Sequence, residues 1–442
     1  MEIKAVIGAN YGDEGKGQFT AYFANKVKLE NKNAKVLNVL TNGGAQRGHT
    51  VWYTNGTITE SHVFHNLGSA TLHNADTYIA KTFMLNPITL LAEIKELRTT
   101  VAFHPSNIFI DDRCRFTTPF DMMMSQIRNS SDSSHKSCGM GIWETYTRYR
   151  DTNYNIFIKD FIWMSDQERR EYLRNIRQYY FEIIKSDQRI YENFDRELFF
   201  NENIIQNFIE DVYELRTLEN VEFIHSYQHL KITPLTYLED VYNYDLVVFE
   251  NAQGLLLNWS DDPELKEFTT PSKTGIEAVI DILCENSNYF LSTYKDQIDS
   301  FEVCYVTRTF ITRHGDGPFP YMLLNYANDK ETNITNKWQG SLKAGMLKIP
   351  EMLSRVQNDF KLHMKYNLPV KLNMSLGITF CDMLPKQHNN ILYQIQKDNL
   401  PFHNIYSSTS VYDEYCASLA DCHNCDFLAD CHKGIVAFHN KY

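Results

Sequence analysis

The sequence predicts an α/β fold with a large, mostly parallel central sheet, flanking helices and a helical insertion. Short apolar runs recur along the chain, and each ends in glycine or in polar residues. This pattern is typical of buried parallel strands whose carboxyl ends carry a ligand crevice. A glycine-rich turn and an amphipathic helix from about Phe19 follow the first run. The runs that we interpret as strands are 3–9, 35–41, 245–250, 301–307 and 370–380.

The composition is that of a globular protein. The chain has 442 residues, of which 43% are hydrophobic and 22% charged, so it has ample material for a buried core. This length fits three domains or one large domain with insertions, and we expect a single domain over residues 1–442. A formal net charge of -12 argues against a nucleic-acid partner, because a net anion repels phosphate backbones.

The sequence shows no targeting or membrane segment, so we expect no membrane partner. The opening apolar run is short, and no stretch approaches the ~20 apolar residues that span a bilayer. Cysteines that are scattered singly, such as Cys114 and Cys304, suit a reducing compartment. We therefore expect a cytoplasmic protein.

Two segments differ from the rest. Residues 161–230 predict a helical insertion, because a capping box from Ser165 to Glu168 precedes aromatic and aliphatic residues at helical spacing. We interpret that apolar stripe as packing. The segment 411–442 is rich in cysteine.

The first chemical motif is the turn from Gly8 to Gly17, with the sequence GANYGDEGKG. Glycines around Lys16 let backbone N–H groups converge on a phosphate. It is not a Walker A loop, because Asn10 stands where that pattern has glycine, and glycine follows Lys16 where it has serine or threonine. Asp13 and Glu14 are unexpected beside a phosphate, unless an acid there holds Mg²⁺ or takes a substrate proton. The alternative is an ordinary strand–turn–helix corner with its charged residues in water.

The second motif is the turn from Asn42 to Thr50, with the sequence NGGAQRGHT. It also follows a predicted strand, and it contains His49. A single histidine in a loop is usually an exposed residue without a chemical role. Because the carboxyl ends of parallel strands share one edge of a sheet, we expect His49 near the first turn, where an imidazole can act as an acid.

Together the two turns resemble signatures of the adenylosuccinate synthetase family, GDEGKGK and a GGNNAGHT-type loop. The resemblance continues in family order. Residues 249–254 (FENAQG) are similar to EGAQG, and residues 307–320 (TRTFITRHGDGPFP) are similar to TR-x-x-TR-x-G-x-GPFP. Residues 408–410 (STS) stand where the family has the STG of its last nucleotide loop. These ordered matches span nearly the whole chain, which is thereby identified as a member of this family with a fold related to the P-loop nucleoside triphosphatases.

The resemblance implies a ligase of purine biosynthesis that forms a C–N bond. The family joins L-aspartate to C6 of a 6-oxopurine nucleoside monophosphate, normally IMP, using GTP and Mg²⁺. In this chain, Asp13 corresponds to the base that takes the proton from purine N1, so that O6 attacks the γ-phosphate. His49 and Lys16 correspond to groups that stabilise the transferring phosphoryl group, and Gln253 to a purine contact. Asp13 and the carbonyl of Gly48 are the implied metal ligands.

The resemblance also implies binding residues and a homodimer. The family lends one arginine to the neighbouring subunit, and Arg148 and Arg150 are both candidates for it. The implied aspartate-binding residues are Ser341, Lys343 and Arg313. The implied nucleotide-binding residues are Gly12, Glu14, Gly15, Gly17, Gln46, Ser137, Cys138, Arg150, Ser272, Asp382, Ser408 and Ser410.

Departures from the family pattern concern the substrates. The aspartate loop, TGRRR in the family, reads WQGSLKAG at 338–345, where only Lys343 is positively charged. The guanine-reading TKLD becomes TFCD at 379–382, so ATP or dATP is open as phosphoryl donor beside GTP. The loop GTTGRGIGP reads KSCGMGIW at 136–143, and Gln46 replaces an asparagine.

The identity of the acceptor stays open between IMP, GMP and dGMP. The departures resemble a divergent viral and archaeal branch that makes 2-aminoadenylosuccinate from dGMP. The retained Asp13 favours IMP instead. If the chain is viral, the expected location is the cytoplasm of the host.

Two further alternatives remain. Cys416, Cys422, Cys425 and Cys431 have a spacing that can furnish a tetrahedral Zn²⁺ site, or they are free thiols. A non-catalytic nucleotide-binding or regulatory protein on the same fold is the competing hypothesis for the function. Retention of the four catalytic positions named above favours the enzyme, because a decayed site has no reason to keep them in register.

Overall fold

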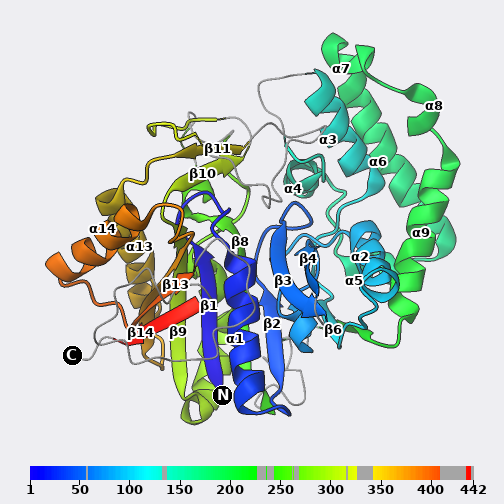
Figure 1. The fold of residues 1–442 in the computed structure, drawn as a ribbon. Helices are drawn as coiled ribbons and strands as arrows, with labels where there is room; N and C mark the ends of the chain where they lie inside the picture. Colours follow the sequence, from blue (N-terminus) through cyan, green and yellow to red (C-terminus); the bar gives the residue numbers. More distant parts are fainter. Residues whose placement is uncertain are drawn as a thin grey trace.

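A ten-stranded sheet forms the centre of the protein, in the order β14-β13-β12-β9-β1-β8-β2-β5-β6-β7 (Figure 1). All neighbouring pairs are parallel except β13 and β14, which are antiparallel. The predicted fold class is therefore confirmed. The computed structural model describes residues 1–442 except 56–57, 132–136, 226–234, 236–242, 261, 263–267, 315–316, 326–341, 409–434 and 440–442.

Each of the predicted apolar runs overlaps a strand of this sheet. The strands are β1 (Glu2–Gly8), β2 (Val36–Leu40), β5 (Asp76–Ile79), β6 (Ile108–Asp111), β7 (Val221–Ile224), β8 (Leu246–Gly254), β9 (Ser300–Arg308), β12 (Leu372–Thr379), β13 (Asn404–Ser408) and β14 (Ile435–His439). Two antiparallel hairpins stand apart from the sheet. They are β3 (His49–Asn55) with β4 (Ile58–Phe64), and β10 (Ile311–His314) with β11 (Leu342–Gly345).

The order of the strands reverses at β1. The chain runs from β1 to β2 and then outward through β5, β6 and β7. It returns to place β8 between β1 and β2, and then continues on the other side of β1 with β9, β12 and β13. In open α/β sheets, ligands bind beyond the carboxyl ends of the strands at such a reversal. The topology thus points to the loops that follow β1, β2 and β8.

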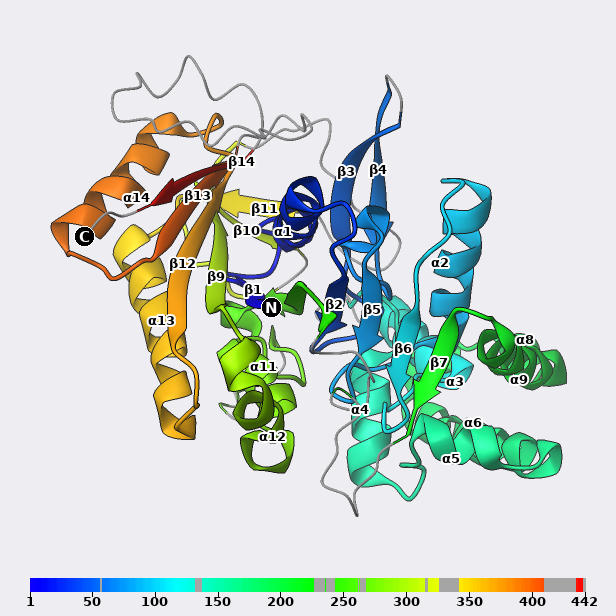
Figure 2. The same cartoon turned by 90° about the horizontal axis from the view of Figure 1, so that it is seen from below.

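Helices cover both faces of the sheet because successive residues of a strand face opposite sides. Ile3, Ala5 and Ile7 pack against α11 (Ile276–Leu283), whereas Val6 packs against aromatic residues of α1 (Lys16–Glu30). Figure 2 shows α1 on one side of the sheet and α11 with α12 on the other. The remaining helices that flank the sheet are α2 (Pro87–Thr99), α12 (Glu285–Tyr294), α13 (Ile349–Lys361) and α14 (Pro385–Lys397).

A run of helices between β6 and β7 forms a lobe beside the sheet (Figure 1). It contains α3 (Pro119–Ser131), α4 (Ile142–Asp151), α5 (Ile158–Trp163), α6 (Asp166–Ser186), α7 (Gln188–Glu192), α8 (Arg196–Phe199) and α9 (Glu202–Thr217). The capping box forms at α6, where Ser165 Oγ accepts from the Glu168 N–H at 3.3 Å and the Glu168 carboxylate accepts from the Ser165 N–H at 2.7 Å. Within the range 161–230, residues 221–224 form β7, the edge strand of the central sheet.

The first helix, α1 (Lys16–Glu30), begins earlier than the position near Phe19 that its apolar periodicity predicts. Gly15 caps it in the left-handed region, with φ of 95°. Glycine adopts this conformation without steric cost, so the helix starts directly after the phosphate loop. Lys16 and Gly17 consequently lie in its first turn, where backbone N–H groups have no intrahelical partner.

No helix in the described part of the chain is both long and apolar enough to cross a lipid bilayer.

Candidate active site

The loops after β1 and β8 are in direct contact. A methyl group on Gly254 would lie 2.4 Å from the carbonyl oxygen of Asn10, a distance too short for any side chain. Gln253 therefore lies against the first loop, and its backbone is in the left-handed region with φ of 62°. Because non-glycine residues seldom adopt this conformation, tertiary contacts must hold it there.

His49 lies against the first turn of α1. A methyl group on Gly17 would be 2.9 Å from Cβ of His49, so the second loop packs onto the residue that follows Lys16. Two further strand ends reach the first loop. Arg308 Nε donates to the Asp13 carbonyl, and Thr379 Oγ1 donates to the Glu14 carbonyl at 2.9 Å. The structure thus brings together the loops that carry Asp13, Lys16, His49 and Gln253.

The side chain of Glu14 occupies the inside of the first loop. Its Oε1 accepts from the N–H groups of Asn10 at 3.0 Å and Gly12 at 2.8 Å. These are backbone donors of the kind that bind phosphate in other glycine-rich loops. Glu14 is the residue that occupies them here, which differs from the direct nucleotide contact expected from the sequence.

Burial shifts both charged groups of the loop. It raises the pKa of Glu14, although the Lys16 charge opposes this, and it lowers the pKa of Lys16 against the pull of Glu14 and Asp13. Lys16 Nζ donates to the Gly12 carbonyl at 2.6 Å and lies 3.8 Å from Glu14 Oε2. That carboxylate oxygen is buried and has no hydrogen-bond partner among the described residues. The loop is therefore a buried site of mixed charge.

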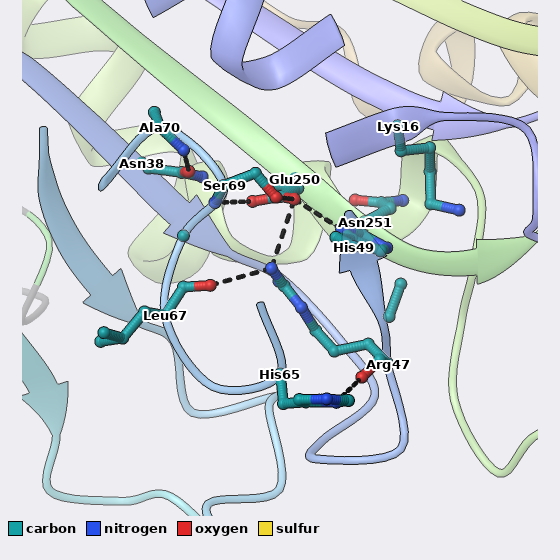
Figure 3. A network of polar contacts seen from close by, with 12 residues as sticks. Lys16, Asn38, Arg47, His49, His65, Leu67, Ser69, Ala70, Glu250 and Asn251 are labelled. Atoms are coloured by element: carbon teal, nitrogen blue, oxygen red, sulfur yellow. Dashed lines mark hydrogen bonds and ion pairs between the residues drawn. The ribbon is translucent and has the colours of Figure 1, made fainter. Parts of the chain in front are cut away.

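A network around Glu250 fixes the imidazole of His49 (Figure 3). Nδ1 of His49 lies 2.5 Å from Oε1 of Glu250. Ser69 contributes its N–H to Oε2 at 3.0 Å and its hydroxyl to Oε1. Nη2 of Arg47 lies 3.3 Å from Oε1 and donates to the Leu67 carbonyl at 2.9 Å.

The network sets the protonation of both partners. Burial and the Arg47 charge lower the pKa of His49 to about 3, although Glu250 opposes the shift. Burial alone raises the pKa of Glu250, but Arg47, His49 and the Ser69 N–H outweigh it, and the pKa lies well below its ordinary value. A neutral imidazole therefore donates from Nδ1 to an ionised carboxylate, and Nε2 remains for a ligand.

Glu250, Arg47 and Ser69 belong to the site although the sequence motifs did not predict a role for them. The position of Glu250 in the sequence could have indicated its role. It is the acidic last residue of a predicted buried strand, and a buried acid needs a partner. Ser69 lies on a connecting loop that no motif marks. Its role depends on the register in which β8 lies beside β2.

The second and third loops also present unpaired amides. Both polar atoms of the Gln46 side chain and Oε1 of Gln253 are buried without a hydrogen-bond partner among the described residues. Asn42 ties the loops together, since its Nδ2 donates to the Ala252 carbonyl at 3.2 Å and to Ser272 Oγ at 3.4 Å. Gln46, Gln253 and Ser272 therefore lie around the same pair of loops.

The loop before α4 carries Ser137 and Cys138. Ser137 is tied to α3, since its Oγ lies 3.1 Å from Ser125 Oγ and its N–H donates to Asn129 Oδ1 at 3.0 Å. Burial raises the pKa of Cys138 to about 11, so its thiol is a weak neutral donor.

The two candidates for a shared arginine differ in environment. Arg148 is fully buried, and its Nε and Nη2 each lie 2.9 Å from a carboxylate oxygen of Asp121 in the same chain. It is therefore unable to reach another subunit. Arg150 is exposed, pairs with Asp151 and lies over the ring of Tyr146. Arg150 alone of the two is accessible to a partner.

The two loops assigned to the phosphoryl donor are adjacent, since the Cys381 N–H donates to the Ser408 carbonyl at 3.0 Å. Asp382 is exposed beside them. Phe380, where the family pattern has lysine, is buried with φ of 57°, and the Arg308 guanidinium lies 4.3 Å from its ring centroid. An aromatic ring that contacts an arginine thus occupies the position where the family pattern has lysine.

Arg313 and Lys343 are direct partners in the β10–β11 hairpin. Arg313 is buried, donates from Nη1 to the Pro318 carbonyl at 2.7 Å and lies 4.7 Å from the ring of Tyr11. Arg355 of α13, which the sequence analysis did not single out, donates from Nε to the Ala9 carbonyl at 2.9 Å and from Nη2 to Asn10 Oδ1 at 2.7 Å. Both arginines thus border the first loop.

Several predicted residues lie outside the part of the chain that the structure describes. They are Ser341, Ser410, Cys416, Cys422, Cys425 and Cys431. Among the described residues, no group of three or more histidine, cysteine, aspartate or glutamate side chains could hold a metal ion. The prediction of a zinc site therefore has no support from this structure.

The chain is similar to known proteins in both sequence and structure. Residues 5–337 match the family model for adenylosuccinate synthetase. Adenylosuccinate synthetase from Acaryochloris marina is 27% identical over 331 residues, which cover 72% of this chain and 62% of that protein. The enzyme from Thermodesulfovibrio yellowstonii is 25% identical over 331 residues, 72% of this chain and 65% of that protein. The matched segment thus spans a little under two thirds of these relatives.

Solved structures show the same fold. Adenylosuccinate synthetase from Plasmodium falciparum has a TM-score of 0.56 at 17% identity and covers 85% of this chain and 77% of its own. Succinoaminodeoxyadenylate synthetase of cyanophage S-2L, solved with dGMP and with dATP as an energy donor, has a TM-score of 0.54 at 11% identity and covers 91% of this chain and 92% of its own. Fold and loops therefore define an α/β protein with glycine-rich loops at the reversal of its strand order. The chain belongs to the adenylosuccinate synthetase family.

Proposed function

We propose that the protein is a ligase of purine nucleotide biosynthesis. It joins L-aspartate to C6 of a 6-oxopurine nucleoside monophosphate through a 6-phosphoryl intermediate, driven by GTP or ATP. The convergence of Asp13, Lys16, His49 and Gln253 on three touching loops carries this proposal. Each loop follows a parallel strand at the reversal of strand order, where such a site is expected.

The first step transfers a phosphoryl group. The Asp13 carboxylate takes the proton from purine N1, and O6 attacks the γ-phosphorus while the bond to the nucleoside diphosphate breaks. Lys16 faces the charge that develops on the transferring group, and His49 donates to it from Nε2 when the bound anionic phosphates favour protonation of the ring. Such donors act strongly because the site is buried, with Lys16 1% and His49 6% exposed.

In the second step, the amine of L-aspartate attacks C6 and inorganic phosphate leaves with the former O6. The amine loses a proton, and the C–N bond replaces the C–O bond. Arg313, Lys343 and Ser341 are the proposed contacts of the aspartate carboxylates. Arg313 and Lys343 support this, because they lie opposite each other in one hairpin beside the first loop.

The donor set of the first two loops fits Mg²⁺. Asp13 offers a carboxylate and is only partly buried, and Gly48, which offers its carbonyl, is exposed. Mg²⁺ takes oxygen ligands and commonly uses one or two protein groups together with substrate phosphates. A bound Mg²⁺ would neutralise phosphate charge. Asp13 and Gly48 would hold it, while Asp13 keeps one oxygen for the purine proton.

The nucleotide contacts divide into two groups. The proposed contacts of the acceptor nucleotide are Gln46, Gln253, Ser272, Ser137, Cys138 and Arg150. The proposed residues of the phosphoryl-donor site are Gly12, Glu14, Gly15, Gly17, Asp382, Ser408 and Ser410. Unpaired buried amides at Gln46 and Gln253 support the first group. Glu14 acts through the loop, by holding the Asn10 and Gly12 N–H groups in place.

A homodimer and a cytoplasmic location complete the proposal. The exposed Arg150, on a helix that follows the loop of Ser137 and Cys138, is the arginine that reaches a second subunit. The described cysteines Cys114, Cys138, Cys284 and Cys304 are free thiols, which supports a reducing compartment.

A turnover matrix tests the function and assigns the substrates. IMP, GMP, dGMP and, as a negative control without a 6-oxo group, AMP are each incubated with L-aspartate and Mg²⁺ against GTP, ATP and dATP. Succinylated product from IMP identifies adenylosuccinate formation. Product only from dGMP places the chain with the phage synthetase, and the buried Phe380 then accounts for a donor other than GTP. No product from any pair, with nucleotide binding intact, supports the non-catalytic nucleotide-binding protein instead.

A further inference from the structure

Arg47 connects two parts of the site that are distant in the sequence. It lies between β2 and β3 and is 3% exposed. Its Nη2 donates to the Leu67 carbonyl at 2.9 Å and lies 3.3 Å from Oε1 of Glu250. One guanidinium thereby ties the loop around Leu67 to the carboxylate in β8 (Figure 3).

Glu250 has little freedom to move once these contacts form. Ser69 holds it from one side through its N–H and its hydroxyl, and Arg47 holds it from another. The same oxygen that faces Arg47, Oε1, lies 2.5 Å from Nδ1 of His49. The orientation of the imidazole is therefore set by where Arg47 and Ser69 place the carboxylate.

We propose that Arg47 is a positioning residue, which holds the Glu250 carboxylate in the orientation that fixes the His49 imidazole beside the phosphate loop. The inference rests on the proposed function, because His49 serves the transferring phosphoryl group there. Contact between His49 and Gly17, the neighbour of Lys16, places the ring where such a constraint matters. If the imidazole rotated about its Cβ–Cγ bond, Nε2 would no longer point toward the phosphate.

The unused donors of Arg47 support a role at Glu250. Nε and Nη1 are buried and have no hydrogen-bond partner among the described residues. Buried donors without partners destabilise a fold, so packing alone does not account for a guanidinium here.

Steady-state kinetics of Arg47→Met and Arg47→Lys test the proposal. Because misplacing a catalytic group by about 1 Å costs about 10²-fold, Arg47→Met should lower kcat by about that factor, with KM for both nucleotides within about two-fold. Arg47→Lys keeps the charge but is unable to bridge the Leu67 carbonyl and Glu250 Oε1. Its kcat should therefore lie between those of Arg47→Met and the wild type. A kcat of Arg47→Met within about two-fold of wild type would overturn the proposal.

A double-mutant cycle separates action through Glu250 from an independent role. If Arg47 works through the carboxylate, Arg47→Met should have little further effect on kcat in a Glu250→Gln background. Effects that multiply would overturn the proposal and indicate direct contact with a ligand. The matched control is Arg113→Met, which removes a partly buried arginine paired with Asp111 and Glu285 outside the site. It should lower the thermal midpoint and leave kcat unchanged.

Nuclear magnetic resonance of ¹⁵N-histidine reads the same constraint without turnover, so it remains informative if the proposed function fails. The His49 signals are assigned by their loss in His49→Gln. In the wild type they should report a neutral ring protonated at Nδ1, and in Arg47→Met the Nε2-protonated form should appear. Identical tautomers in both proteins would contradict the role of Arg47. Where Arg47→Met does not fold, Arg47→Lys carries the same comparison.

Discussion

Nδ1 of His49 lies 2.5 Å from Oε1 of Glu250, so a residue of the second loop and the last acidic residue of a predicted buried strand form one unit. The two residues are 201 positions apart in the sequence. They meet because β8 inserts between β1 and β2, which places the carboxyl end of β8 beside the loop that leaves β2. The reactivity of the site therefore depends on the strand order as well as on its motifs.

Replacing Glu250 with glutamine should slow the reaction strongly. Glutamine keeps the shape but removes the charge that orients the imidazole, and we expect kcat to fall by about 10²-fold or more. Glu302→Gln is the matched control. Glu302 is an equally buried acid on β9 that pairs with Lys4 at 2.7 Å, away from the site. Comparable loss of kcat in both variants would show that general damage to the sheet is the cause.

The ion pair of Arg148 with Asp121 should be a determinant of stability. Both side chains are fully buried, and removal of one partner leaves an unpaired charge in the interior. Arg148→Met should lower the free energy of unfolding by about 3–5 kcal/mol, measured by denaturant unfolding. Arg150→Met, two residues along the same helix and exposed, should unfold like the wild type. An Arg148→Met protein of wild-type stability would contradict the assigned burial.

Subunit complementation tests the proposed role of Arg150. Arg150→Met and Asp13→Asn should each be inactive, because one lacks the shared arginine and the other the base. Mixed dimers contain one site with a native Asp13 and an arginine from the neighbour, so mixing the two inactive proteins should restore part of the turnover. If the mixture stays inactive although mass spectrometry shows mixed dimers, Arg150 acts within its own subunit or not at all.

Stability should depend on pH through Asp359. Burial raises its pKa to about 6, while Tyr305 and the Ile276 N–H, which donate to it at 2.7 and 2.9 Å, oppose the shift. Between the ordinary value of 3.8 and about 6, the folded protein keeps a proton that the unfolded chain has lost. Stability should therefore fall as pH rises through this window, by about 2–3 kcal/mol in total.

Asp359→Asn isolates this effect, because asparagine has no charge to bury. The stability of the variant relative to the wild type should increase by that amount between pH 4 and 7, as measured by urea unfolding. A difference that does not change with pH would show that Asp359 stays ionised in the folded protein.

Metal removal should separate catalysis from folding. Chelation with EDTA should stop turnover, and Mg²⁺ should restore it, because the metal belongs to the bound nucleotides. The thermal midpoint should not change, since no cluster of metal-binding side chains exists among the described residues. A lowered midpoint together with stoichiometric zinc in elemental analysis would instead indicate a structural site in the cysteine-rich segment.

Much of the fold was predictable from the sequence, because the strands β1, β2, β8, β9 and β12 are short apolar runs that end in glycine or polar residues. Sequence periodicity placed the start of α1 too late. The reason is that Gly15 caps the helix in a left-handed conformation, which no apolar pattern records. The edge strand β7 was also not predicted, because it follows directly after a long helical region.

The sequence motifs predicted which loops form the candidate site. They did not predict the contacts that join these loops. Glu14 was expected to face the nucleotide, whereas its carboxylate accepts from two N–H groups of its own loop. Arg148 and Arg150 were indistinguishable in the sequence, and only the packing of Asp121 separates them. Contacts between loops that are more than 200 residues apart, such as that of Arg47 with Glu250, depend on strand order and register.

The fate of the purine oxygen shows whether the reaction passes through a 6-phosphoryl intermediate. With an acceptor labelled with ¹⁸O at C6, we expect the label in inorganic phosphate, one equivalent for each succinylated product, because O6 attacks the γ-phosphorus before aspartate displaces it. Asp13→Asn should form neither product while still binding nucleotide. Label released into water, or phosphate without label, would contradict the 6-phosphoryl intermediate and with it the roles assigned to Asp13, Lys16 and His49.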